Sequence, residues 1–273
     1  MTLEVCGLFV HPIKSAGALA VSEARLEARG LEGDRRWLVV QPDGTFLTQR
    51  QEARMALIRP RLDGDKLFVQ APGFEEVAVA VGGEERLRST VWGSEVEALC
   101  ATPEADRWIE SFLGRPARFV HMDEVAERRV QADGQGPARE VSFADELPVL
   151  VATEASLADL NGRLDEPVSM ERFRPNIVVR GAEAFDEDVW RRLGCEGWEL
   201  DMVKPASRCV VVTIDQRTAE QHPAKEPLAT LAAFRRTTRG GRSNKAGRVY
   251  FGVRAAPLRT GLVRVGDELE PFG

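Results

Sequence analysis

RWLVVQPDGTFLTQ, residues 36–49, places two runs of β-branched and aromatic residues on either side of a Pro-Asp-Gly turn signal. This pattern predicts a β-hairpin. Short runs of the same character lie around it, namely LFVH at 8–11, KLFVQ at 66–70 and EVAVAV at 76–81. We therefore expect the first 100 residues to form mostly strands.

Three segments have the spacing of amphipathic helices. In 104–113 one face of a helix would carry Trp108, Ile109, Phe112 and Leu113. In 153–164 Thr153 is a suitable N-cap, and the inward positions would be Leu157, Leu160 and Leu164. In 226–236 Pro227 suits the first turn of a helix.

The rest of the second half is again rich in strand patterns. We predict strands at LPVLVA (147–152), NIVVRG (176–181), WELDMV (198–203), CVVVTID (209–215), RVYFGVR (248–254) and LVRVGDELE (262–270). Strands outnumber helices and do not alternate with them, which argues against a doubly wound nucleotide-binding fold. The expected fold class is α+β, mostly β, with two lobes built on barrel-like sheets.

A polar, glycine-containing segment at 122–140 reads as an exposed connection between the lobes. We place the domain boundary there, with an N-terminal domain at 1–122 and a second domain at 123–273. Two modest domains suit a chain of 273 residues.

The formal net charge of -6 argues against binding to nucleic acid, because that affinity comes largely from lysine and arginine side chains that neutralise phosphates. No run approaches the roughly 20 apolar residues of a membrane helix, and the N-terminus lacks the features of a signal peptide. We therefore expect a cytoplasmic protein with no membrane segment, whose partner is a small molecule or another protein.

Four short motifs combine a cation with a small polar residue beside a predicted strand: HPIKS (11–15), GDRRW (33–37), FRPN (173–176) and SRC (207–209). Each suits an anionic ligand, because guanidinium and ammonium groups pair with phosphate. Each also has a structural explanation. Lys14 and Ser15 would merely end a strand, Arg35 would belong to a solvated ion-pair cluster, and Arg174, held extended before a proline, would shape a loop.

The four cysteines are scattered singly, without a C-x-x-C pair, so a zinc ribbon or a disulfide framework is not expected. Cys209 is most simply explained as a buried core thiol. Its neighbour Arg208 favours a second interpretation, because a nearby cation promotes the thiolate that metals bind.

Two other features give weaker signals. Residues 235–248 carry six cations and three glycines, which fits either a solvated loop or a lid over an anion. His11, His121 and His222 lie far apart in sequence and match no catalytic triad.

Taken in order, HPIKS, GDRRW, TQRQEARMALI, TEASLADLNGRL, FRPNIVV, SRCVVVTID, KEPLATLAAFR and the terminal VGDELE resemble the MOSC-domain family. Within that family the chain is similar to the mitochondrial amidoxime-reducing components and their bacterial relatives. The resemblance covers nearly the whole chain and implies an N-terminal MOSC β-barrel domain followed by a MOSC domain.

The resemblance implies a molybdenum cofactor, in which a pterin dithiolene holds the metal and one protein thiolate ligates it. Carried over by motif, Cys209 is the metal ligand and the catalytic residue. The cofactor-binding residues implied in the same way are Lys14, Ser15, Arg35, Arg174, Asn176, Ser207, Arg208 and Arg254. Three positions depart from the family pattern. Glu146 and Leu147 replace small hydroxyl residues, and Arg254 replaces a tyrosine, which leaves phosphate contacts and substrate shape open.

The family suggests a molybdenum-dependent oxidoreductase that reduces amidoximes, hydroxylamines or N-hydroxylated bases. Its electrons would come from a separate protein, such as a cytochrome b5-like protein, a ferredoxin or a flavoprotein reductase. The alternative is a sulfur-transfer or cofactor-carrier protein with a persulfide or the cofactor on Cys209. MOSC-containing sulfurases add a large pyridoxal-phosphate domain, for which we expect no room in this chain. A barrel protein that has lost cofactor binding is the third possibility.

Overall fold

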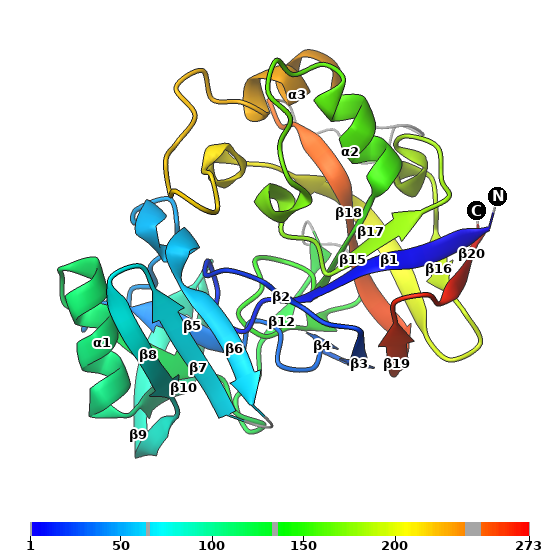
Figure 1. Cartoon of the computed structure of the whole chain (residues 1–273). Helices are drawn as coiled ribbons and strands as arrows, with labels where there is room; N and C mark the ends of the chain where they lie inside the picture. The colour runs from blue at the N-terminus through cyan, green and yellow to red at the C-terminus, as the bar shows by residue number, and fades with distance from the viewer. Residues whose placement is uncertain (1, 64–65, 133–135, 238–246, 273) are drawn as a thin grey trace.

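The computed structural model describes residues 2–63, 66–132, 136–237 and 247–272. Figure 1 shows two lobes side by side, with the two ends of the chain next to each other on the second lobe. Strands outnumber helices in both lobes, which confirms the predicted α+β, mostly β class.

The second lobe is built on a closed barrel. Its strands, in spatial order, are β1 (Leu3–Val10), β15 (Ile177–Arg180), β14 (Val149–Thr153), β18 (Tyr250–Arg259), β17 (Glu199–Ser207), β16 (Arg192–Gly194) and β20 (Glu268–Phe272). The barrel closes because β1 pairs with both β15 and β20. A closed barrel leaves no unpaired sheet edge within it.

The first residues of the chain belong to this same lobe. Besides β1, the short strand β2 (Leu19–Ala20) pairs with β1. Strand β3 (Glu23–Glu27) pairs with β4 (Gly30–Leu31) and with β19 (Gly261–Arg264). Residues 3–31 therefore fold against strands from the other end of the chain. The boundary at residues 122 and 123 stays a prediction.

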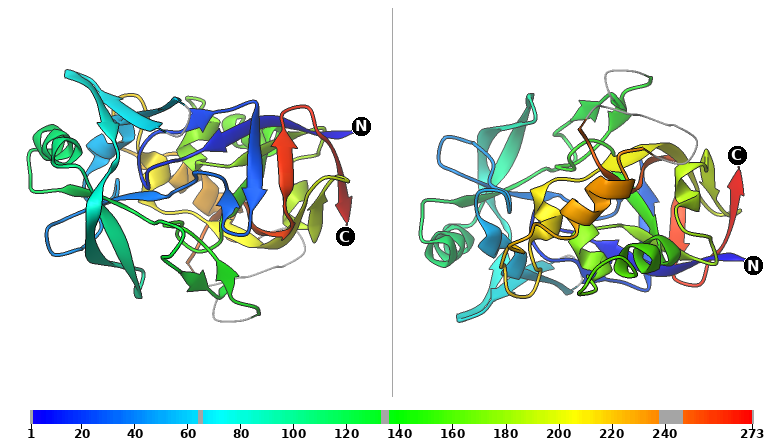
Figure 2. Two further views of the ribbon diagram at one scale, coloured as in Figure 1. Left: turned by 90° about the horizontal axis from the view of Figure 1, so that it is seen from below. Right: turned by 90° about the horizontal axis from the view of Figure 1, so that it is seen from above.

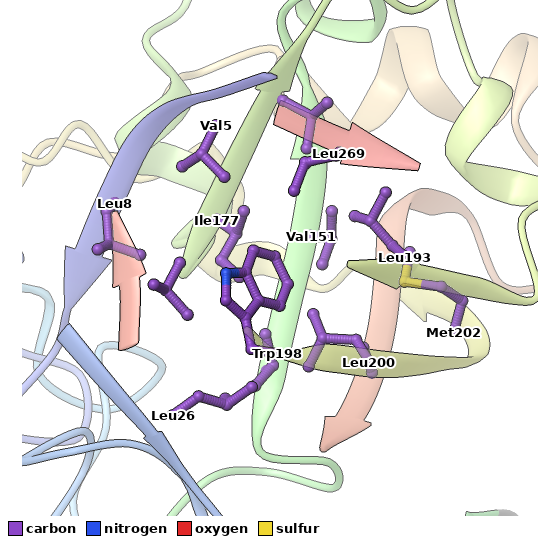
Figure 3. Packing of buried hydrophobic residues seen from close by; sticks show 14 of the residues in the cluster. Val5, Leu8, Leu26, Val151, Ile177, Leu193, Trp198, Leu200, Met202 and Leu269 are labelled. Atoms are coloured by element: carbon purple, nitrogen blue, oxygen red, sulfur yellow. The ribbon is translucent and has the colours of Figure 1, made fainter. Parts of the chain in front are cut away.

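The interior of the barrel is apolar. Figure 3 shows Trp198 at its centre, among side chains such as Val151 and Leu200. The indole is fully buried, and its Nε1 donates a hydrogen bond to Asp267 Oδ2 at 2.8 Å. The polar edge of the ring is thus satisfied while its apolar area fills the core.

The first lobe carries two sheets. One contains β5 (Trp37–Val40), β11 (Arg118–His121), β10 (Ser94–Ala101) and β9 (Val81–Val91). The other contains β6 (Arg59–Asp63), β7 (Lys66–Ala71) and β8 (Phe74–Val79). Between β5 and β6 lies the 3-10 turn η1 (Ala53–Leu57), and the connection to the second lobe holds β12 (Arg129–Val130) and β13 (Arg139–Glu140).

The predicted hairpin at 36–49 is present. The backbone of Gln41 accepts and donates across the turn with Gly44 and Thr45, and Val40 pairs with Phe46. Its first strand is β5, whereas the second side of the hairpin pairs only through an isolated bridge.

The predicted helices are confirmed with small shifts at their ends. They are α1 (Pro103–Leu113), α2 (Glu154–Asn161) and α3 (Leu228–Phe234). The Thr153 side chain caps α2 by accepting from the backbone N–H of Ser156, as expected. Figure 2 shows α2 and α3 over one side of the barrel, where Leu160 and Leu231 are buried in a shared apolar cluster.

One predicted strand was wrong and another is divided in two. The run CVVVTID does not continue as a strand, because Val210–Thr213 form the 3-10 turn η5. Burial of Val212 and a hydrogen bond from Thr213 Oγ1 to the carbonyl of Val210 outweigh the β-propensity of the run. The segment 262–270 is two strands, β19 and β20, separated by a turn at Gly266.

Two further 3-10 turns, η3 (Met170–Phe173) and η4 (Asp186–Asp188), complete the second lobe. In the part of the chain that the structure describes, no helix has both the length and the apolarity needed to cross a membrane.

Candidate functional site

All nine predicted site residues line one cavity of about 590 Å³. Its walls come from both lobes, since Thr48, Arg50 and Trp92 of the first lobe face the end of β17 in the second. Motifs separated by almost 200 residues thus meet at one place.

Cys209 lies just beyond the end of β17, where Ser207 still pairs with Tyr250 of β18. The residue is partly buried, and its backbone is extended before η5 begins. Its Sγ accepts a hydrogen bond from Nη2 of Arg50 at 3.2 Å. The sulfur therefore faces the cavity beside a cation.

The cation that contacts Cys209 is not its neighbour in sequence. The Arg208 guanidinium turns back into the barrel wall and donates to the carbonyls of Phe251 and Phe173. Gly252 has a φ of 71°, and a Cβ at this position would lie 2.6 Å from the carbonyl oxygen of Val151. Only glycine fits this bulge beside the Arg208 side chain.

Three predicted site residues have left-handed backbone conformations, with φ of 66° at Ser15, 52° at Arg35 and 55° at Arg174. This conformation costs a non-glycine residue about 1 kcal/mol. Our prediction that Arg174 is extended was wrong, because its backbone N–H closes η3 onto Glu171. Strained residues of this kind gather at binding sites, where the surrounding structure holds them.

Asn176 holds this strained region together. Its side-chain amide donates to the carbonyl of Phe9 and to Asp34, and it accepts from Arg35 and from the backbone N–H of Leu150. These four bonds satisfy the amide completely. Asn176 therefore positions Arg35 at the cavity wall.

Lys14 is buried and pairs with Asp145, and its Nζ also donates to the carbonyl of Phe143 at 2.8 Å. Burial lowers the pKa of Lys14 to about 8. The negative charge of Asp145 acts in the other direction but does not cancel this effect. Burial alone would raise the pKa of Asp145, but the charges of Lys14 and Arg254 hold it well below its usual range.

The cavity has a strong excess of positive charge. Among the described residues that line it, nine are lysine or arginine and two are carboxylates. Burial lowers the pKa of Arg174 and of Arg208 to about 9, and that of Arg128 to about 10. Burial is the largest cause of these shifts, and neighbouring cations add to it at Arg174 and Arg208, so the cavity favours an anionic ligand.

Several of these cations have N–H groups directed at no acceptor. The buried atoms Arg128 Nε, Arg172 Nη1 and Arg174 Nη2 have no hydrogen-bond partner within the described part of the chain. Because buried donors in native proteins are nearly always paired, these atoms fit a bound ligand rich in acceptors, such as a phosphate.

Sequence reasoning missed four cationic or aromatic residues of the cavity, namely Arg50, Trp92, Arg128 and Arg172. Arg50 lies in TQRQEAR, a segment that carries the family resemblance, and Arg172 stands two residues before Arg174. Arg128 lies in the polar connection at 122–140, where nothing distinguishes it from the neighbouring arginines. Nothing in the sequence around Trp92 indicates a site.

The three positions at which we expect a departure from the family pattern also line this cavity. Glu146 lies 3.6 Å from Arg254 and 2.6 Å from Lys204. Leu147 is buried. Glu146 thus lies beside Arg254, the other charged residue of the three.

Of the remaining candidates, Arg248 at the end of the predicted lid lines the cavity. The described residues that line the cavity include no histidine. His11 is buried beside the carbonyl of Pro175, and the partly buried His121 ring lies against Trp37, with ring centroids 4.5 Å apart. Within the predicted lid, residues 238–246 lie outside the described residues. Arg235 instead forms a buried ion pair with Asp188.

Comparison with known proteins identifies the family. The model of the MOSC N-terminal beta barrel domain matches residues 2–116, and the model of the MOSC domain matches residues 138–270. The chain belongs to the MOSC-domain family. The two MOSC segments together span most of the sequence, in the order that we predicted.

Among MOSC relatives, mitochondrial amidoxime-reducing component 1 of Homo sapiens is 35% identical over 98% of this chain and 83% of its own length. Mitochondrial amidoxime reducing component 2 is 34% identical in Rattus norvegicus and 32% identical in Bos taurus. Each of these two matches covers 96% of this chain and 81% of the relative.

Proposed function

We propose that this chain is a molybdenum-cofactor-dependent reductase of N-hydroxylated compounds that receives electrons from a separate protein. One observation carries the proposal: the thiol of Cys209 opens into a cavity whose buried guanidinium groups have unpartnered N–H donors. The relatives named amidoxime-reducing components support the same activity.

The residues present fit such a cofactor. A thiolate at Cys209 is a soft ligand for the metal. Arg35 and Arg174, which converge through the hydrogen bond from Arg35 to the Arg174 carbonyl, would hold the phosphate. Lys14 and Ser15 would bind the pterin end. In the described part of the chain no cluster of three or more His, Cys, Asp or Glu residues could hold a metal ion.

When bound, the cofactor supplies a metal that changes oxidation state by two electrons, the number needed to break one N–O bond. The protein residues bind and orient the reactants. Reduction also consumes two protons and releases water. Because Lys14 has a pKa of about 8 and its partner Asp145 stays ionised, this pair would hold a proton beside the cavity near neutral pH.

For the substrate we propose a chemical class, and for the electron donor a type of protein. The substrate would be a small amidoxime, hydroxylamine or N-hydroxylated base. The donor would be a cytochrome b5-like protein, a ferredoxin or a flavoprotein reductase. The cytoplasmic location stays a prediction.

The test begins with metal and pterin analysis of the purified protein, followed by reduction of benzamidoxime with an artificial electron donor. Cys209→Ala should abolish the reduction. Cys195→Ala is the matched control, because Cys195 is also partly buried but does not line this cavity. Full activity of Cys209→Ala would overturn the assignment.

The same experiment separates the alternative. Protein that contains no molybdenum but carries one extra sulfur atom on Cys209, detected by mass spectrometry, would indicate sulfur transfer. Protein that never contains pterin or molybdenum would indicate a barrel without cofactor.

A further inference from the structure

Trp92 stands at the tip of the hairpin between β9 and β10. Val91 pairs with Ser94, so Trp92 and Gly93 form a two-residue turn. Both have positive φ, 51° and 84°, as in turns of type I′. Such turns favour Asn, Asp or Gly at the first position, and a bulky residue there is an outlier. The turn itself therefore does not explain the tryptophan.

The indole is exposed, yet its orientation is fixed. Trp92 is 53% exposed and lines the cavity. Its Nε1 donates to Asp145 Oδ1 at 3.0 Å, and its ring meets Phe46 in a T-shaped contact with centroids 5.3 Å apart. An exposed aromatic ring held in one orientation at a cavity is suited to stacking on a flat ligand.

Arg50 joins this ring to the thiol. Its guanidinium carbon lies 5.1 Å from the Trp92 ring centre, and its Nη2 lies 3.2 Å from Cys209 Sγ. Since one guanidinium spans both contacts, the ring centre is within about 10 Å of the sulfur. A ligand whose reacting N–O group lies near the thiol can therefore reach the indole with an aromatic substituent.

We propose that Trp92 determines substrate specificity by stacking on the aromatic group of N-hydroxylated substrates, so that aryl amidoximes and N-hydroxylated aromatic bases bind better than aliphatic ones. This inference rests on the proposed function. Trp92 contacts the substituent, and the N–O group lies beyond it toward Cys209.

The experiment compares benzamidoxime with acetamidoxime, which carry the same reacting group on a phenyl ring or a methyl group. Dissociation constants are measured by calorimetry on oxidised holoenzyme without an electron donor, and KM and kcat are measured with a donor. Trp92→Leu should lower the preference for benzamidoxime roughly three- to tenfold, through Kd and KM rather than kcat. Trp92→Phe should keep most of the preference.

The two variants share the strained turn, so a difference between them reports on the aromatic face. Trp108→Leu is the control, because Trp108 is a partly exposed tryptophan of the same lobe that does not line the cavity. An unchanged preference in Trp92→Leu would overturn the inference. A wild-type protein that reduces neither compound would instead contradict the proposed function, and the calorimetric comparison would still decide the role of Trp92.

Discussion

The guanidinium of Arg50 donates a hydrogen bond to Cys209 Sγ across 3.2 Å and links the two lobes at the cavity. Arg50 follows β5 in the first lobe, and Cys209 follows β17 in the second. Each lobe therefore contributes a part of the site that the other lacks, and the contact between Arg50 and Cys209 depends on how the lobes fit together.

Removal of the Arg50 cation should make the Cys209 thiol less reactive. A charge-assisted hydrogen bond favours thiolate over thiol, and thiolate is the nucleophile. In cofactor-free protein near neutral pH, Arg50→Leu should slow alkylation of Cys209 by iodoacetamide several-fold. Peptide mass spectrometry would follow Cys209 separately from the other cysteines.

Arg54→Leu is the control for this prediction. Arg54 lies in η1, four residues from Arg50, and its guanidinium stacks on Phe112 away from the cavity. Its loss should leave the alkylation rate unchanged, and Arg50→Lys should retain part of the effect. Equal rates in wild type and Arg50→Leu would show that this hydrogen bond does not activate the thiol.

Much of the fold follows from local patterns. The helix 104–113 has an apolar face, and Thr153 offers a cap, so both were predicted from short-range chemistry alone. The run CVVVTID has the composition of a strand but forms η5, because burial of Val212, a tertiary effect, decides its conformation. The pairing of β1 with β15 joins residues more than 160 positions apart, which no local pattern reveals.

The candidate site shows the same limit. Lys14, Arg35 and Arg174 were identified through family motifs, and the cavity brings them together. Arg50 and Trp92 were missed because their roles depend on the distance between the lobes, which the sequence around them does not encode. The neighbour that we favoured, Arg208, points into the barrel wall instead.

Ser15→Gly should stabilise the cofactor-free protein. Ser15 has a φ of 66°, which glycine adopts without strain, so the free energy of unfolding should rise by about 0.5–1 kcal/mol. Ser22→Gly, at an exposed serine without positive φ, should lower it by a similar amount. Urea unfolding measures both.

If Ser15 binds the cofactor, the more stable variant Ser15→Gly should also purify with less molybdenum.

Gly252→Ala should disrupt the wall behind Cys209. The new Cβ would lie 2.6 Å from the Val151 carbonyl oxygen at a residue with positive φ, so the loss in unfolding free energy should be roughly 3 kcal/mol or more. Gly73→Ala is matched, because Gly73 has a φ of 80° and no atom within 4 Å of the added Cβ. Its cost should be about 1 kcal/mol. Similar losses in the two variants would show that packing at Gly252 is unimportant.

Glu187 should make the stability of the protein depend on pH. It lies in η4 and is fully buried against the start of α2, where Ser156 and Thr153 donate hydrogen bonds to its carboxyl group. Burial raises the pKa of Glu187 from 4.5 to about 7, against the effect of these hydrogen bonds. The folded protein thus holds this proton more tightly than the unfolded chain does.

The stability that comes from this proton is complete below the unfolded pKa of 4.5 and is lost as the pH rises through about 7. Between about pH 5.5 and about pH 8.5 the wild type should lose about 2 kcal/mol of unfolding free energy through Glu187. Glu187→Gln cannot ionise, so this loss should disappear, as measured by urea unfolding at the two pH values. Glu183→Gln, at an exposed acid nearby, should behave as wild type. A pH dependence that persists in Glu187→Gln would assign it to other groups.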